Sequence, residues 1–176
     1  MSILLVLGSL LIVIFLLNKQ AFIQMPSTNT LLVQKLSNAR WFKNEWLSGI
    51  FLFFINALLF SVAVSLFFLL GVLNIPFLHL VIMLLATFVS IYLWIAIHNA
   101  GNKGKRERLI MSTIGSSFYL FLLLTFIYMI ANLGPGTPEN DTFMAFIGLL
   151  FALYVSFVAL VTCFCITGLT KKQYRI

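Results

Sequence analysis

The side chains that could do chemistry in this chain are two cysteines and two histidines. Cys163 and Cys165 lie in the last of several long apolar segments, and His98 ends the third such segment. A thiolate beside a histidine can act as a nucleophile. If neighbouring segments run antiparallel, His98 lies at the same depth as the two cysteines. The sequence therefore permits a thiol site at that end of the molecule.

Geometry excludes the other combinations of these groups. His79 begins the third segment, and a rise of 1.5 Å per residue places it about 25 Å from Cys163 in depth. Cys163 and Cys165 are two residues apart on a helix and point about 200° away from each other, so they cannot share a metal ion. An unactivated, buried cysteine behaves as a small inert hydrophobe, and we expect this packing role for Cys163.

The carboxylates offer no alternative active site. The chain has four of them, and all lie between the apolar segments or at their edges: Glu45, Glu107, Glu139 and Asp141. Transporters and membrane enzymes ordinarily embed an acid or a base, because burying one is costly and needs a reason. We therefore expect no enzyme, no metal and no cofactor. Asp141 lies in a glycosylation sequon, which we interpret as a helix cap.

Composition places these groups in a membrane protein. Hydrophobic residues make up 62% of the chain and charged residues 9%, against roughly 45–50% and about a quarter in soluble domains. A helix needs roughly 20 apolar residues to cross a bilayer. The sequence predicts an all-α integral membrane protein of one domain, residues 1–176, with a bundle of about five transmembrane helices. They cover residues 2–17, 48–70, 76–97, 109–132 and 142–169.

The basic residues predict how the chain is threaded through the bilayer. All eleven fall in three short stretches: Lys19, Lys35, Arg40 and Lys43; Lys103, Lys105, Arg106 and Arg108; Lys171, Lys172 and Arg175. Short loops rich in Lys and Arg stay cytoplasmic. We expect a bacterial cytoplasmic membrane protein with its N-terminus outside and its C-terminus cytoplasmic. The alternative has residues 2–17 in the interface and both termini inside.

The first basic stretch also predicts a short cytoplasmic interfacial helix between helices one and two. Its apolar residues recur at roughly helical spacing: Leu32, Leu36, Ala39, Phe42 and Trp46. Basic side chains lie among them, and Trp41 and Trp46 would anchor the helix at the membrane surface. An irregular solvated loop is the alternative.

The second basic stretch could bind anionic lipid headgroups through Lys103, Lys105, Arg106 and Arg108, or could simply set the topology. Nucleic acid is a poor partner for a chain whose basic residues flank membrane spans. The expected first partner is the lipid bilayer.

Small residues predict where the helices pack. In residues 142–169 they recur every three or four positions: Ala145, Gly148, Ala152, Ser156, Ala159, Cys163, Thr167 and Thr170. Shorter sets occur elsewhere: Ala57, Ser61 and Ser65, and Ser112, Gly115, Ser116 and Tyr119. Such residues let helix backbones approach closely in a membrane. Asn56 is the most polar side chain at depth in its helix, and we expect it to form an interhelical hydrogen bond, with substrate contact as the alternative.

Three functions are compatible with this pattern. The first is a non-catalytic membrane subunit or accessory protein that associates with another integral membrane protein or a second copy of itself. The second is a small oligomeric transporter, channel or lipid-translocating protein, in which several copies surround a path lined by Asn56, Ser61, Ser65, Ser112 and Ser116. The third is a thiol enzyme at the cytoplasmic face.

Overall fold

The computed structural model describes residues 30–73, 78–101, 103–134 and 141–170, and over these ranges the chain forms helices and no strand. The predicted first helix, residues 2–17, lies outside the described residues. The elements are α3 (Leu31–Asn38), the 3-10 helix η1 (Arg40–Lys43), α4 (Glu45–Leu73), α5 (Leu78–Ala100), α6 (Lys105–Ala131), α7 (Thr142–Phe164) and the π-helix η2 (Cys165–Leu169). The predicted all-helical class is confirmed.

Four of the helices are long and apolar enough to cross a membrane: α4, α5, α6 and α7 continued by η2. Two of them, α4 and α6, begin earlier than hydropathy predicts, because capping interactions extend them. Asn44 Oδ1 accepts a 2.9 Å hydrogen bond from Trp46 N, so α4 already begins at Glu45. Asp141 Oδ1 accepts bonds from Phe143 N and Met144 N, which confirms its predicted role as a helix cap.

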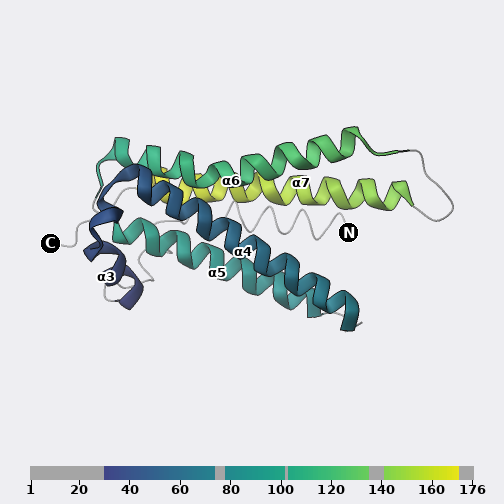
Figure 1. The fold of residues 1–176 in the computed structure, drawn as a ribbon, viewed down its shortest axis with the longest axis horizontal. Helices are drawn as coiled ribbons and strands as arrows, with labels where there is room; N and C mark the ends of the chain where they lie inside the picture. Colours follow the sequence, from purple (N-terminus) through teal and green to yellow (C-terminus); the bar gives the residue numbers. More distant parts are fainter. Residues whose placement is uncertain (1–29, 74–77, 102, 135–140, 171–176) are drawn as a thin grey trace.

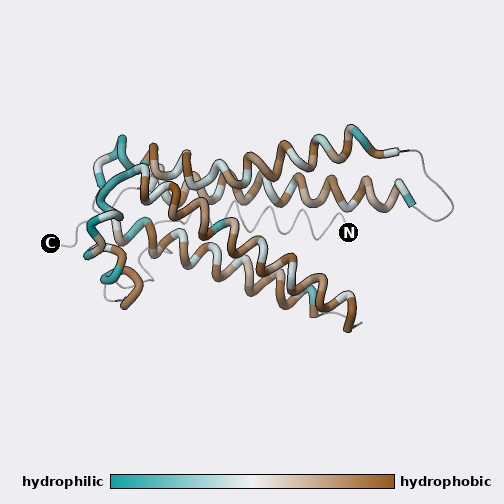
Figure 2. The backbone as a smooth tube through the Cα atoms, viewed as in Figure 1, coloured by the Kyte–Doolittle hydropathy of each residue, from teal (hydrophilic) through white to brown (hydrophobic). Residues whose placement is uncertain are grey.

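The four long helices form two hairpins that meet at one end and diverge toward the other (Figure 1). One hairpin is α4 with α5, the other is α6 with α7, and α4 packs closely against α6 where the hairpins meet. We call this the basic end, because α3, η1 and the start of α6 bring Lys35, Arg40, Lys43, Lys105 and Arg106 there. Figure 2 shows that hydrophilic residues are concentrated at the same end. The opposite end is called the far end.

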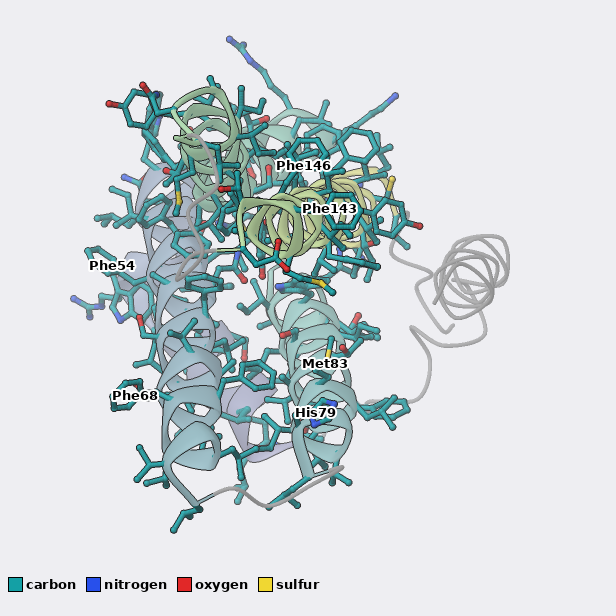
Figure 3. The ribbon with its side chains drawn as sticks, turned by 90° about the vertical axis from the view of Figure 1, so that its right-hand side faces the viewer. Phe54, Phe68, His79, Met83, Phe143 and Phe146 are labelled. Carbon is teal, nitrogen blue, oxygen red and sulfur yellow. The ribbon has the colours of Figure 1, made fainter. Side chains whose placement is uncertain are left out.

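The buried core lies toward the basic end. Leu52, Ile97, Met111 and Ile166 are among the largest fully buried side chains. The far halves of the helices instead expose large apolar groups, such as Phe68 at 77%. Figure 3 views the far end and shows Phe68 pointing outward from α4. Exposed side chains of this kind suit a hydrocarbon solvent.

The helix predicted between helices one and two is present as two short pieces, α3 and η1, rather than one. α3 lies across the basic end against α5 (Figure 1), and Ala39 takes an extended conformation before η1 begins. This break changes the face that packs. Val33 and Phe42 are buried, while Leu32 and Trp46, expected on the apolar face, are exposed. The exposure of Leu32 and Trp46 agrees with the membrane-facing position expected for them, whereas the continuous helical spacing expected through Ala39 is interrupted there.

Candidate functional site

A single buried side chain links all four long helices. Asn56 on α4 is fully buried, and its Nδ2 donates to Gly115 O on α6 at 3.0 Å and to Cys163 Sγ on α7 at 3.8 Å. Its Oδ1 accepts bonds from Trp94 Nε1 on α5 at 2.8 Å and from the Tyr119 hydroxyl at 3.4 Å. We call these five residues the Asn56 cluster. The predicted interhelical role of Asn56 is confirmed.

Glycines let α4 come close enough to α6 for these bonds to form. A Cβ at Gly115 would lie 2.3 Å from Leu52 Cδ2, and one at Gly49 would lie 2.8 Å from Ile114 Cβ. Both distances are shorter than van der Waals contact allows. The Gly115 carbonyl can accept from Asn56 in addition to its own helix because a carbonyl oxygen has two lone pairs. The Asn56 cluster therefore depends on the absence of side chains at these crossings.

A second polar group of residues closes the bundle around η2. The ring of His98 is buried, and its Nδ1 lies 3.3 Å from Thr167 O. A carbonyl can only accept, so a hydrogen bond between these two atoms requires the tautomer with its proton on Nδ1. Arg108 Nη1 donates to Thr170 O. A helix end leaves carbonyls without partners, and basic side chains commonly satisfy them. α5 and α6 thus cap the end of the α7–η2 helix.

η2 packs against α6 as closely as α4 packs against α6 beside Asn56. A Cβ at Gly168 would lie 2.4 Å from Ser112 Oγ, and Thr167 Oγ1 donates to Cys163 O at 2.7 Å. The sequence did not predict that His98 and Arg108 cap η2, since a π-helix has no sequence signature that hydropathy detects. The signal that could have indicated this capping is the presence of His98 at the end of α5 and Arg108 at the start of α6.

Lys103 points into the protein. Its Nζ donates to Asn44 O at 3.4 Å and to Ser48 Oγ, and lies 4.9 Å from the centroid of the Phe42 ring. Partial burial lowers the pKa of Lys103 to about 8, an effect that the nearby carboxylates of Glu45 and Glu107 oppose. Lys103 thus holds the α5–α6 connection against η1 and the start of α4.

The other predicted headgroup ligands differ in exposure. Lys105 and Arg106 are exposed, whereas Arg108 is half-buried and bonds to Thr170 O. The four basic residues of this stretch therefore do not form one surface.

The small residues that recur along α7 and η2, which we call the α7 stripe, also differ in exposure. Toward the basic end it is buried, at Ser156, Cys163, Thr167 and Thr170. Ala152 and Ala159 are half-buried, and Ala145 and Gly148 are exposed. On α4, Ala57 is half-buried, and Ser61 and Ser65 are exposed. On α6, all four predicted packing residues are buried: Ser112, Gly115, Ser116 and Tyr119.

The arrangement is suited to holding helices together. The Cys163 thiol is completely buried against the Asn56 amide, and His98 hydrogen-bonds to a backbone carbonyl. Within the described ranges, no group of three or more His, Cys, Asp or Glu side chains could hold a metal ion. Comparisons with protein-family models, curated proteins and solved structures found no match for the chain.

Proposed function

We propose that this chain is a non-catalytic accessory subunit of a membrane complex, which receives a helix of another integral membrane protein, or of a second copy, along the far half of its bundle. The observation that carries the proposal is the uneven packing of the four long helices. Near the basic end they are joined by the Asn56 cluster and capped around η2. Toward the far end the hairpins diverge (Figure 1) and their side chains are exposed.

The outer part of the α7 stripe supports a contact with another helix. Gly148 is exposed, and a Cβ added there would meet nothing within 4 Å. Ala145 and Ala152 lie one turn away on either side. In a membrane, small residues at this spacing promote close association of helix backbones. The inner part of the stripe is already used within the chain, so the outer part is the portion left for a partner.

The same proposal gives the chain an orientation. The basic end faces the cytoplasm, because short segments rich in Lys and Arg remain on that side. Its support is that the exposed residues Lys35, Arg40, Lys43, Lys105 and Arg106 all belong to elements at one end, where Figure 2 shows a concentration of hydrophilic residues. Five crossings, with residues 2–17 as the first and the N-terminus outside, complete the arrangement in a bacterial cytoplasmic membrane.

The test compares two glycines in the same environment. Gly148→Leu fills the outer stripe with a bulky side chain, while Gly71→Leu makes the same change on α4, where a Cβ also meets nothing within 4 Å. Each variant is purified in mild detergent, and its mass and co-purifying membrane proteins are determined. We expect Gly148→Leu to lose the partner or the second copy and Gly71→Leu to keep it. Retention by both variants contradicts the proposal.

A small oligomeric transporter, channel or lipid-translocating protein is the second candidate. It is favoured by Ser61 and Ser65, which lie one turn apart and are exposed in the far half of α4. Against it, Asn56, Ser112 and Ser116 are buried in helix contacts, so one chain alone does not align them along a path. Flux through reconstituted vesicles that falls when both Ser61 and Ser65 are changed to Ala would favour this function over the first.

A further inference from the structure

We infer that η1 forms a binding site for the phosphate group of an anionic phospholipid, with Arg40 and Lys43 as its cationic ligands. This site is separate from the helix-binding face proposed above, because it lies at the basic end. The ligand is a diacyl lipid of the membrane that the four long helices span.

The backbone of η1 places the two cations together. Arg40 and Lys43 are three residues apart in a 3-10 helix, which has three residues per turn, so both side chains leave the same side. Both are exposed. Phe42 between them is only 2% exposed, and its ring lies under Lys103 Nζ. The turn is therefore held against the bundle while its two cations face outward.

Aromatic residues beside η1 place these cations at headgroup depth. Trp41 is 43% exposed and packs edge-to-face on Phe42 and Phe51, with ring centroids 5.7 and 5.0 Å apart. Trp46 is 60% exposed. Tryptophan prefers the boundary between hydrocarbon and headgroups. Exposed Ile50, one turn further along α4, offers a surface to the acyl chains, which favours a lipid over free phosphate.

Charge also favours η1 over the start of α6. There, Lys103 and Arg108 donate to groups inside the protein. Lys105 and Arg106 are exposed, but they adjoin Glu107, whose carboxylate caps the helix through Gly104 N at 3.0 Å and repels an anion. Beside η1, Glu45 lies at the start of α4, two residues after Lys43, and both Glu45 and Glu107 interact with the charge of Lys103. The start of α6 differs from η1 because its carboxylate directly follows the two exposed cations in the sequence.

The experiment uses two double variants that lose the same charge at the same end. Arg40→Gln with Lys43→Gln removes the proposed ligands, and Lys105→Gln with Arg106→Gln is the matched control. The full chain in detergent is titrated with phosphatidylglycerol or phosphatidylcholine, and bound lipid is counted by native mass spectrometry. A headgroup contact is worth about 1 kcal/mol per basic residue, so we expect the η1 variant to bind phosphatidylglycerol about thirtyfold more weakly. The control should change less than about threefold.

Three results would overturn the inference. Equal weakening by the two double variants would mean diffuse attraction to the whole basic end. Equal binding of phosphatidylcholine and phosphatidylglycerol would mean that the anion is not recognised. Full competition by inorganic phosphate would assign η1 to a free anion instead. Because the four substituted side chains are exposed, we expect all variants to unfold at the wild-type temperature.

Discussion

Trp94 Nε1 on α5 donates a 2.8 Å hydrogen bond to Asn56 Oδ1 on α4, and both side chains are buried between the helices. Tyr119 brings a second donor to the same oxygen from α6. Both donors are buried, so neither can turn to water if the acceptor is lost. The helices are therefore held at a fixed rotation and depth relative to one another, which nonpolar contacts alone define less sharply.

Replacing Asn56 by Leu removes the acceptor for two buried donors. We expect a loss of about 1–3 kcal/mol of unfolding free energy, measured by reversible unfolding in detergent micelles. Asn132→Leu is the matched control, because Asn132 is exposed and donates to Tyr128 O in its own helix. Equal losses of unfolding free energy in the two variants would show that the hydrogen bonds between helices at Asn56 stabilise the protein no more than a bond within one helix does.

Gly115 and Gly148 should respond in opposite directions to alanine. A Cβ at Gly115 would overlap Leu52, and overpacking of this kind costs about 1–3 kcal/mol. At Gly148 a Cβ meets nothing within 4 Å, so the higher helix propensity of alanine should stabilise α7 by up to about 1 kcal/mol. Thermal unfolding of the two variants checks both signs. A stabilised Gly115→Ala protein would contradict the close crossing of α4 and α6.

Lys103 should make stability rise with pH above neutrality. Burial lowers its pKa from the ordinary value of 10.5 to about 8. Below about pH 8 both folded and unfolded chains carry the proton, and the cost of burying the charge is present in full. Between about pH 8 and 10.5 the unfolded chain binds more protons than the folded one, so the unfolding free energy increases with pH.

The measurement for Lys103 is the difference in unfolding temperature between the wild type and Lys103→Met from pH 7 to 10. Other titrating groups are common to both proteins and cancel in that difference. We expect the unfolding temperature of the wild type to rise relative to that of Lys103→Met as the pH increases. A difference that stays constant or falls would mean that the Lys103 amine is solvated in the folded protein.

The two thiols should differ in reactivity. Cys163 is completely buried, whereas Cys165 is half-buried. In the native protein we expect a maleimide to label Cys165 first, and we expect Cys165→Ala to react only after unfolding. Mass spectrometry of the labelled protein identifies the modified residue. Rapid labelling of Cys163 in the native protein would show that its thiol is accessible. That result would support the third function named above, a thiol enzyme at the cytoplasmic face.

Hydropathy predicted where the long helices lie better than where they begin. Glu45 and Lys105 are helical although charged, because Asn44 and Gly104 supply capping interactions that an average over apolar residues does not register. The inward position of Asn56 followed from its polarity alone, since no other use of an amide at that depth is as common.

The partners of these residues could not be predicted in the same way. Trp94 meets Asn56 because of the depth and rotation of α5, which depend on all its contacts together. Lys103 turns inward because Ser48 and Phe42, far away in the sequence, lie beside it. The division of the α7 stripe depends on where α4 and α6 cross. Each of these contacts is set by tertiary packing rather than by local pattern.

The divergence of the two hairpins makes local stability uneven along the molecule. Beyond the Asn56 cluster, α4 continues to Leu73 and α5 begins at Leu78, with most of their side chains exposed. Separating the far ends of the hairpins breaks none of the bonds at Asn56, so it costs much less free energy than unfolding the whole bundle. We therefore expect the angle between the α4–α5 hairpin and the α6–α7 hairpin to change more readily than the packing at the basic end.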